Sequence, residues 1–417
     1  MTTILALNAG SSSLKFALYA AATDGQRLLL GGAVSDTHTD TPTITTRIGD
    51  ATTSARFAPD DQTTVFDAIH EAVAAIGSPG CVVHRLVRGD PGDRGPVILT
   101  PAIIEALHTA ETLAPLHLPN ELEYIHIVER RLAGVTQIAC FDTDFHHDLP
   151  EVASRYALPA TLWDQGLRRY GFHGLSYESV LDHLGPNRPN KVVVAHLGHG
   201  ASLAAIRNGR CVDTTMGFTP TGGLVMATRC GDLDPGALIH ILRSGYDVDR
   251  LDDLVNRHAG LLGLSGTTSD METLLEHSAH DAAAALAIDV YCHTARRHLG
   301  ALTATLNGID TLVFTGGIGE HAPPIRAAIC EGLQHIGLRI DPSANNANDT
   351  VISQPGSTVE VLVIGADEER MLAQHAATAL AASAHDPTST STLERRVDRA
   401  DKSPNATPTP NNERRLQ

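Results

Sequence analysis

Two segments of this sequence share one pattern, and that repetition constrains the fold more than any other feature. The first opens at Thr3 and reads TILALN, AGSSS, LKFALY; the second opens at Lys191 and reads KVVVAHL, GHGAS, LAAIRNG. Each has a β-rich run, a turn of small residues and a second strand leaving that turn. Between them, helical patterns at 65–77 and 101–114 alternate with short apolar strands, as in α/β domains with mixed sheets. We therefore predict a duplicated α/β domain; two unrelated α/β domains are the alternative.

Length and composition limit what the chain can do. Its 417 residues suggest two domains, and an apolar content of 42% is enough to build a core in each. The chain has 31 basic and 48 acidic residues, a net charge of -17. This acidity argues against a nucleic-acid partner, which would require a basic face. It does not exclude a small anionic substrate, because a few arginines in a cleft create a local positive field.

Nothing in the sequence predicts export or membrane insertion. The opening residues, MTTILALNAGSSSLKF, place no basic residue before the short apolar run, unlike a signal peptide. No stretch approaches the roughly 20 apolar residues that span a bilayer. The six cysteines are scattered without a CxxC pair, which is typical of reduced thiols. We expect a soluble, cytoplasmic protein that makes no membrane contact.

Three turns rich in glycine or serine follow predicted strands. Asn8–Lys15, NAGSSSLK, would bring backbone N–H groups and an ammonium group close to an anion. The turn at 196–202, HLGHGAS, repeats this with two glycines. A buried strand at 311–315 runs into the glycine cluster 316–319, after which Pro323 opens a helix. Each turn alone is also typical of an ordinary loop, but three in one chain indicate phosphate chemistry.

Four polar side chains lie at predicted strand ends or in compact loops. Arg85 and Asp142 end strands, a position that often faces a ligand crevice in α/β sheets. His173 lies in RRYGFHG, and Arg229 lies in the glycine- and aspartate-rich MATRCGDLDPG. An arginine can hold a carboxylate or a phosphoryl group through its planar fork. Taken singly, each of the four also fits a salt bridge or a structural role.

Together these motifs resemble the acetate kinase family of acetate, propionate and butyrate kinases. The resemblance follows the ordered chain through LNAGSSSLKFALY, VVHRLV, LAPLHLPNEL, CFDTDFHHDLP, RRYGFHGLSYESV, DTTMGFTPTGGLVMATRCGDLDPG and FTGGIGEHAPPIRAAICEGL. It implies a duplicated ribonuclease-H-like α/β fold, shared with actin, the Hsp70 ATPase domain and sugar kinases, with an interdomain cleft. It also implies a homodimer and reversible, Mg²⁺-dependent phosphoryl transfer from ATP to acetate, giving acetyl phosphate and ADP.

The resemblance divides the chain into segments. We expect one ribonuclease-H-like domain at 1–149 and a second, nucleotide-binding one at 150–366, with a helix near 367–384 returning to the first. Residues 385–417 are polar and nearly free of large apolar side chains. They cannot bury enough surface to order themselves, so we predict a disordered tail.

The resemblance also implies roles for individual positions. The catalytic positions are Asp142, His173, Arg229 and Arg85. The substrate pocket comprises Arg85 with the apolar Val87, Leu116, Phe172 and Pro220. The nucleotide positions are Lys15, His196, Gly198, His199, Gly200, Asp270, Met271, Glu272, Gly316, Gly317, Ile318 and Gly319. Asn8 and Glu368 would position Mg²⁺. A carboxylate substrate is ionised at neutral pH, so the transfer requires positioning and charge neutralisation rather than a general base; we expect Asp142 to position rather than to abstract a proton.

The sequence departs from the family mainly on the nucleotide side. His199 and His321 replace asparagines, Glu272 replaces an arginine, and Leu118 and Ala366 are also unusual. The catalytic positions are intact. Propionate or butyrate as acceptor and a phosphoryl donor other than ATP therefore stay open alternatives. A non-catalytic, actin-like scaffold is a further alternative, but it would not need the retained arginine, histidine and aspartate set.

Overall fold

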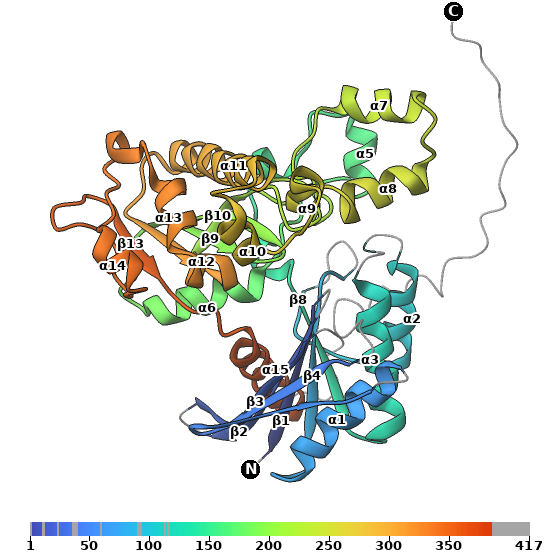
Figure 1. Cartoon of the computed structure of the whole chain (residues 1–417). Helices are drawn as coiled ribbons and strands as arrows, with labels where there is room; N and C mark the ends of the chain where they lie inside the picture. The colour runs from blue at the N-terminus through green and yellow to red at the C-terminus, as the bar shows by residue number, and fades with distance from the viewer. Residues whose placement is uncertain are drawn as a thin grey trace, which may run out of the picture.

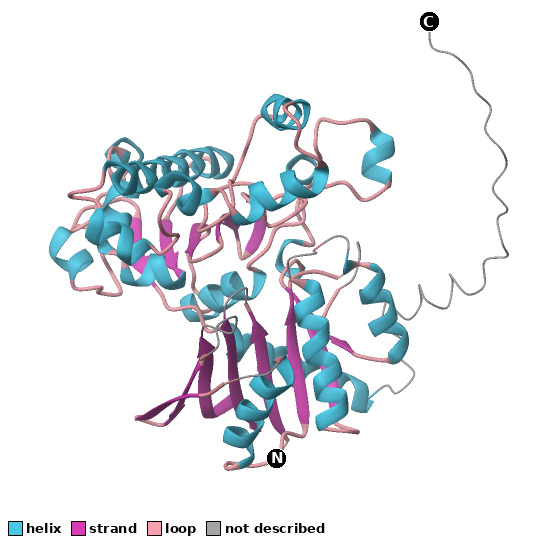
Figure 2. Ribbon diagram, turned by 45° about the vertical axis from the view of Figure 1, so that its right-hand side comes forward, coloured by secondary structure: helices cyan, strands magenta, loops and turns pink. Residues whose placement is uncertain are grey.

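The computed structural model describes residues 2–385 apart from 11–12, 23–24, 36–40, 59–60, 90–93, 112–113 and 115–116. Within these residues the chain forms two β-sheets flanked by helices (Figures 1 and 2). The first sheet has eight strands in the order β5-β4-β3-β2-β1-β6-β8-β7. Their bounds are β1 Thr3–Ala9, β2 Ser13–Ala22, β3 Gly25–Ser35, β4 Thr43–Ile48, β5 Ala51–Arg56, β6 Cys81–Leu86, β7 Val97–Ile98 and β8 Thr136–Phe141.

The second sheet repeats the centre of the first. Its five strands lie in the order β11-β10-β9-β12-β13, with bounds β9 Lys191–Leu197, β10 Ala201–Arg207, β11 Arg210–Thr214, β12 Thr311–Thr315 and β13 Glu360–Val363. In both sheets a first strand pairs antiparallel with the next strand in sequence and parallel with a later one: β1 with β2 and β6, and β9 with β10 and β12. The order β3-β2-β1-β6-β8 thus matches β11-β10-β9-β12-β13. The predicted duplication, with one hairpin opening each copy, is confirmed.

Helices cover both faces of the first sheet, which explains why its central strand is apolar along its whole length. Successive side chains of a strand point to opposite faces. Leu5 and Leu7 of β1 pack with α1 (Gln62–Ala74) and α3 (Leu118–Arg131), while Ile4 and Ala6 face the opposite side and pack with α15 (Glu368–His385). Figure 1 shows α15, the last labelled helix, beside the first sheet. The chain thus ends its described part against the sheet with which it began.

The second sheet is also covered on both faces. Val193 and Ala195 of β9 belong to the core that includes the long helix α11 (Ala282–Leu306). Val192 and Val194 face the other side and pack with α6 (Gly174–Leu184). The remaining α-helices are α2 Pro101–Thr109, α4 Glu151–Ser154, α5 Ala160–Asp164, α7 Pro235–Arg243, α8 Val248–Arg257, α9 Gly260–Ser265, α10 Met271–His277, α12 Gly316–His321, α13 Pro323–Cys330 and α14 Pro342–Asn346, with 3-10 turns at Asp144–His146 and Leu333–Ile336.

Two local expectations need correction. The helix predicted over 101–114 ends at Thr109. The glycine cluster after β12 is not a loop before a helix, because the helix α12 begins at Gly316 itself and α13 follows at Pro323. Gly316 has a φ of 77°, and a Cβ there would lie 2.8 Å from the backbone oxygen of Leu197. Glycine is therefore required where β12 turns into α12 beside β9.

Some expectations stay predictions. The domain divisions at 149/150 and 366/367 are among them. Of the tail expected at 385–417, only His385, which ends α15, lies among the described residues. No helix in the described part of the chain is long and apolar enough to cross a membrane.

Candidate active site

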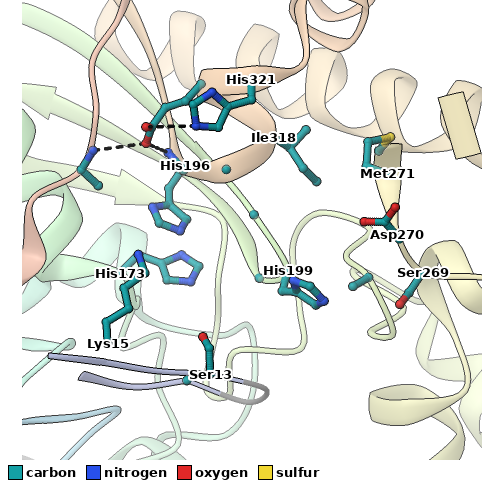
Figure 3. Close-up of a pocket in the computed structure, with 18 of the residues that line it drawn as sticks. Ser13, Lys15, His173, His196, His199, Ser269, Asp270, Met271, Ile318 and His321 are labelled. Carbon is teal, nitrogen blue, oxygen red and sulfur yellow. Dashed lines mark hydrogen bonds and ion pairs between the residues drawn. The ribbon is translucent and has the colours of Figure 1, made fainter. Parts of the chain in front are cut away.

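A cleft of about 900 Å³ lies at the carboxyl ends of the parallel strands of both sheets. Asn8 comes from β1, Arg85 from β6 and His196 from β9, and Gly316 directly follows β12. This is where open α/β sheets bind ligands. Figure 3 shows His173, His196 and Lys15 grouped at one end of this cleft and Asp270, Met271 and Ser269 at the other.

Most of the predicted site residues line this cleft. They are Asn8, Lys15, Arg85, Val87, Phe172, His173, His196, Gly198, His199, Gly200, Pro220, Arg229, Asp270, Met271, Glu272, Gly316, Gly317, Ile318 and Glu368. Asp142 and Gly319 do not line it. Gly319 is buried in α12, and Asp142 is buried behind Arg85. Leu116 lies outside the described residues.

Arg85 is held in place from three sides. Its Nε and Nη2 donate to Asp142 Oδ2 at 3.2 and 2.6 Å, and its Nη1 donates to the Ala9 carbonyl oxygen at 3.1 Å and to Glu121 Oε1 at 3.0 Å. The guanidinium is therefore fixed before any ligand binds. The pKa of Arg85 is lowered by burial, but the carboxylates of Asp142 and Glu121 outweigh that effect and the net shift is upward.

Asp142 accepts from Arg85 with one carboxylate oxygen, Oδ2. Its Oδ1 is buried and makes no hydrogen bond. Burial raises the pKa of Asp142, while Arg85 opposes that shift. An orphaned buried oxygen of this kind is costly unless a ligand, a water or a cation uses it. Its position behind Arg85 is consistent with the expected positioning role.

Arg229 approaches the same place from the second half of the molecule. Its Nη2 hydrogen-bonds to His117 Nε2 at 3.0 Å, and its Nη1 donates to the Pro220 carbonyl oxygen at 3.1 Å. Burial and, to a lesser extent, the nearby Arg85 lower the pKa of Arg229 to about 10. Burial, Arg229 and Arg85 hold the pKa of His117 well below its usual range. His117 is therefore neutral and accepts the hydrogen bond from Arg229.

His173 and His196 stack on each other beside the two arginines. Their ring centroids are 4.1 Å apart and their planes differ by 25°. His173 Nδ1 pairs with Ser202 Oγ at 2.8 Å, and His196 Nδ1 pairs with Ser176 Oγ at 2.8 Å. Burial lowers the pKa of both imidazoles, so both are neutral at neutral pH.

The backbone at this end is shaped for close approach. His173 has a φ of 61°, the left-handed region that a side-chain-bearing residue rarely adopts. A Cβ added at Gly200 would lie 3.0 Å from His173 Nε2 and 3.5 Å from Arg229 Nη1. Gly200 therefore leaves the space in front of both groups open, and these two donors converge on one volume.

The oxygen atoms beside Lys15 fit a magnesium ion. Asn8 Nδ2 donates to Glu368 Oε2 at 2.8 Å and to Glu369 Oε1 at 2.9 Å, which leaves the Asn8 carbonyl oxygen as an acceptor. Burial raises the pKa of Glu368, but His196 and Lys15 outweigh it, so the net shift is downward and the carboxylate stays ionised. Carboxylate and amide oxygens are the ligands that Mg²⁺ prefers.

No complete metal cage of three or more His, Cys, Asp or Glu side chains occurs among the described residues. Mg²⁺ usually keeps several waters and shares its remaining ligands with substrate phosphates. Asn8 and Glu368 therefore suit a Mg²⁺ ion that enters with a polyphosphate, rather than one that is bound by protein alone.

The far end of the cleft is more open and more acidic. Asp270 caps α10, where its Oδ2 accepts from the backbone N–H of Thr273 at 2.8 Å. These hydrogen bonds from Thr273 lower the pKa of Asp270. Glu272 and Glu276, one helical turn apart, also line this end, and Glu272 is exposed.

The glycine turn of α12 forms the opposite side of this end. Glu320 Oε1 accepts the backbone N–H of Gly316 at 2.9 Å and that of Ala366 at 3.2 Å. A Cβ at Gly317 would meet nothing within 4 Å, so the backbone there faces open space. Figure 3 shows Ile318 and His321 on this side, across from Asp270.

Comparison with known proteins agrees with this geometry. A family model described as the Acetokinase family matches residues 3–374. The chain is 42% identical over 389 residues to the acetate kinase of Rhodopseudomonas palustris (strain TIE-1), covering 89% of this chain and 97% of that one. The chain belongs to the acetokinase family. This makes it a kinase, and so a phosphotransferase.

Solved structures of acetokinase-family proteins share the fold. The acetate kinase of Porphyromonas gingivalis superposes with a TM-score of 0.79 at 33% identity, covering 91% of this chain and 100% of that one. A propionate kinase from Francisella tularensis subsp. tularensis SCHU S4 gives a TM-score of 0.81 at 32% identity, covering 90% and 99%. The predicted family and its duplicated ribonuclease-H-like fold are confirmed.

Sequence reasoning missed several residues that contact the acetokinase site. His117 and Glu121 hold the two arginines, Glu369 shares Asn8 with Glu368, and Glu320 braces Gly316. His117 stands inside the quoted motif LAPLHLP, so a polar residue in an apolar run could have drawn attention to it. Glu121 gave no such signal, because an acidic residue in the first turn of a helix is ordinary.

Proposed function

We propose that this chain is an acetate kinase that transfers the γ-phosphoryl group of ATP to acetate, reversibly and with Mg²⁺, by direct in-line attack. One observation carries the proposal: Arg85 and Arg229, from different halves of the molecule, line one end of a single cleft together with His173 and the apolar Val87, Phe172 and Pro220. A short carboxylate with a small apolar group matches this combination of positive charge and apolar surface.

In this proposal the arginines bind and orient the reactants. The acetate carboxylate is ionised and attacks without a general base, so the protein supplies position and charge compensation. Arg85 and Arg229 neutralise charge on the carboxylate and on the phosphoryl oxygens. Asp142 keeps Arg85 in register through its Oδ2. Asn8 and Glu368 would hold the hydrated Mg²⁺, which supplies charge neutralisation on the phosphates.

We assign His173 as a neutral hydrogen-bond donor to the transferring group. Tyr177 is fully buried, and burial raises its pKa, so its hydroxyl keeps its hydrogen and can donate it to Ser202 Oγ. Ser202 can then donate to His173 Nδ1, which leaves the hydrogen on Nε2. That Nε2 faces the space kept open by Gly200, where a phosphoryl oxygen would lie.

Propionate kinase is the second candidate. The structural similarity to the Francisella tularensis propionate kinase favours it. One methylene changes binding by only about 1–3 kcal/mol, so the apolar pocket does not by itself separate the two acceptors. A homodimer and a cytoplasmic location accompany the family resemblance and stay predictions; sedimentation of the purified protein would test the former.

The test is a panel of acetate, propionate and butyrate assayed with ATP, GTP and pyrophosphate, with the acyl phosphate trapped by hydroxylamine. We expect acetate with ATP to give the highest kcat/KM and each added methylene to lower it by at least about tenfold. Equal kcat/KM values for acetate and butyrate would move the assignment to longer-chain kinases. No hydroxamate with any pair would refute carboxylate phosphorylation.

A further inference from the structure

Glu121 is a buried carboxylate that the proposed chemistry does not use. It lies in the first turn of α3, its side chain is 2% exposed, and both of its oxygens are engaged. Oε1 accepts from Arg85 Nη1 at 3.0 Å, and Oε2 accepts from the backbone N–H of Val87 at 2.9 Å. An ionised carboxylate in this environment requires such partners, since burial of an unpaired charge is strongly unfavourable.

The two groups held by Glu121 are the two that face the acceptor substrate. Arg85 would bind its carboxylate, and Val87 lines the apolar pocket for its alkyl group. Glu121 therefore ties the polar and apolar sides of one subsite to the same helix. Residue 87 lies just past the end of β6, where no neighbouring strand fixes the backbone through this N–H.

Asp142 cannot take over the contacts of Glu121, because the two carboxylates accept from different N–H groups of Arg85. Asp142 uses one oxygen to accept from both Nε and Nη2. The Nη1 group lies on the other side of the guanidinium and has the Ala9 carbonyl and Glu121 as its acceptors. Without Glu121, Nη1 keeps only the carbonyl, and the Val87 N–H loses its acceptor.

The same helix turn also bears on the second arginine. His117, the N-cap of α3, contacts Arg229 at 3.0 Å, and Glu121 lies four residues later on the same face. The beginning of α3 thus contacts Arg85 from the first half and Arg229 from the second. A shift of this turn would move both arginines relative to each other.

We propose that Glu121 is a positioning residue that holds Arg85 and the Val87 backbone in register for the carboxylate substrate. The proposal rests on the proposed function of the cleft. It assigns Glu121 to the acceptor side alone, because none of its contacts reaches the nucleotide end.

The charge of Glu121 provides a readout that a purely structural residue would not give. Burial raises its pKa to about 7, although Arg85 and the Val87 N–H oppose the shift and Asp142 adds to it. The charged groups facing this region are Arg85 from β6, Asp142 after β8 and, beyond the neutral His117, Arg229. A protonated Glu121 loses acceptor strength toward Arg85. The kcat/KM for acetate should therefore fall as the pH is lowered through this range.

The test compares Glu121→Gln, Glu121→Asp and the control Glu123→Gln. Glu123 lies on the same helix but is exposed and pairs with Arg130 on the surface. We expect Glu121→Gln to keep its melting temperature and to lose at least about tenfold in kcat/KM for acetate, the scale for a misplaced reactive group. Its KM for ATP should stay within about twofold of wild type, as expected when only acceptor binding changes.

The pH profiles complete the test. The acidic limb of kcat/KM for acetate should be absent in Glu121→Gln, shifted in Glu121→Asp and unchanged in Glu123→Gln. A Glu121→Gln enzyme with wild-type kcat/KM and an unmoved limb would overturn the proposal. So would an equal loss on the ATP side accompanied by a lower melting temperature, which would mark a structural role.

If Glu121→Gln does not fold, the Glu121→Asp variant is sufficient for the test. An acidic limb of kcat/KM for acetate identical to that of wild type would refute the role of Glu121. A wild-type protein that forms no acyl hydroxamate would instead refute the proposed function, and this inference with it. An active wild type with an indifferent Glu121→Gln variant refutes only the inference.

Discussion

The two ends of the cleft differ in how firmly the protein holds the side chains that face the ligand. At the end proposed for phosphoryl transfer, Arg85, Arg229 and His173 are buried or nearly so, and each is bonded to side chains from another element. At the end proposed for the nucleotide, Asp270 and Glu272 are exposed, and the Asp270 carboxylate accepts hydrogen bonds from Thr273 in its own helix turn. The first end is preorganised for charge development, whereas the second keeps freedom to adapt to its ligand.

This difference suggests where the family chemistry is fixed and where a member can vary. A group that is locked by several buried partners cannot change without disturbing all of them. An exposed acid on a short helix can change at little cost to folding. The unusual residues His199, Glu272 and His321 line the cleft, and all three are exposed.

The largest effect should come from breaking the preorganised end. Arg229→Ala should lower kcat by at least about two orders of magnitude, the scale for losing a preorganised transition-state charge. Arg85→Ala should behave alike. Steady-state kinetics with acetate and ATP would measure this, with Arg243→Ala on the exposed face of α7 as the matched control. A folded Arg229→Ala enzyme with most of the wild-type turnover would show that this arginine is not part of the mechanism. It would also show that the two ends of the cleft do not differ in the way described.

A smaller effect is expected at the exposed end. Glu272→Arg should lower the KM for ATP by about two- to fivefold, the range of an exposed ion pair, because it replaces repulsion of the phosphates by attraction. The KM for acetate should barely change. Initial rates with ATP and with GTP would test this.

Asp249→Arg is the control for that variant. Asp249 occupies the same first-turn position of α8 that Glu272 occupies in α10, but it does not line the cleft. Both substitutions place a cation at a helix N-terminus and should disturb stability similarly. An unchanged or higher KM for ATP in Glu272→Arg would show that Glu272 does not contact the nucleotide, so the acidic end would have another role.

The smallest effect should follow removal of the tail. Every residue that lines the cleft lies at or before Glu368, and residues 386–417 have almost no apolar side chains to bury. A chain ending at His385 should therefore keep wild-type kcat, both KM values and its melting temperature. A marked loss at only one end of the cleft would show that the tail contacts that end.

The sequence alone was sufficient for the local pattern and for the chemistry of the motifs. The strand–turn–strand repeats predicted the duplication, because hydrophobic runs and small-residue turns are set by neighbours in the chain. The same motifs predicted which residues meet in the cleft, and nearly all of them do. The end of α2 was not predicted correctly, since helix ends depend on packing as well as on sequence.

Only the tertiary structure decided how those residues are held. Glu121 looks like an ordinary first-turn acid, and its meaning depends on Arg85, which is 36 residues away in the chain. The contact between His117 and Arg229 spans 112 residues, and that between Asn8 and Glu368 spans 360. Sequence patterns record periodicity over a few turns of chain. Burial, pKa shifts and hydrogen-bond partners instead depend on which distant segments fold against each other, and in this protein that folding fixes the arginines of the cleft.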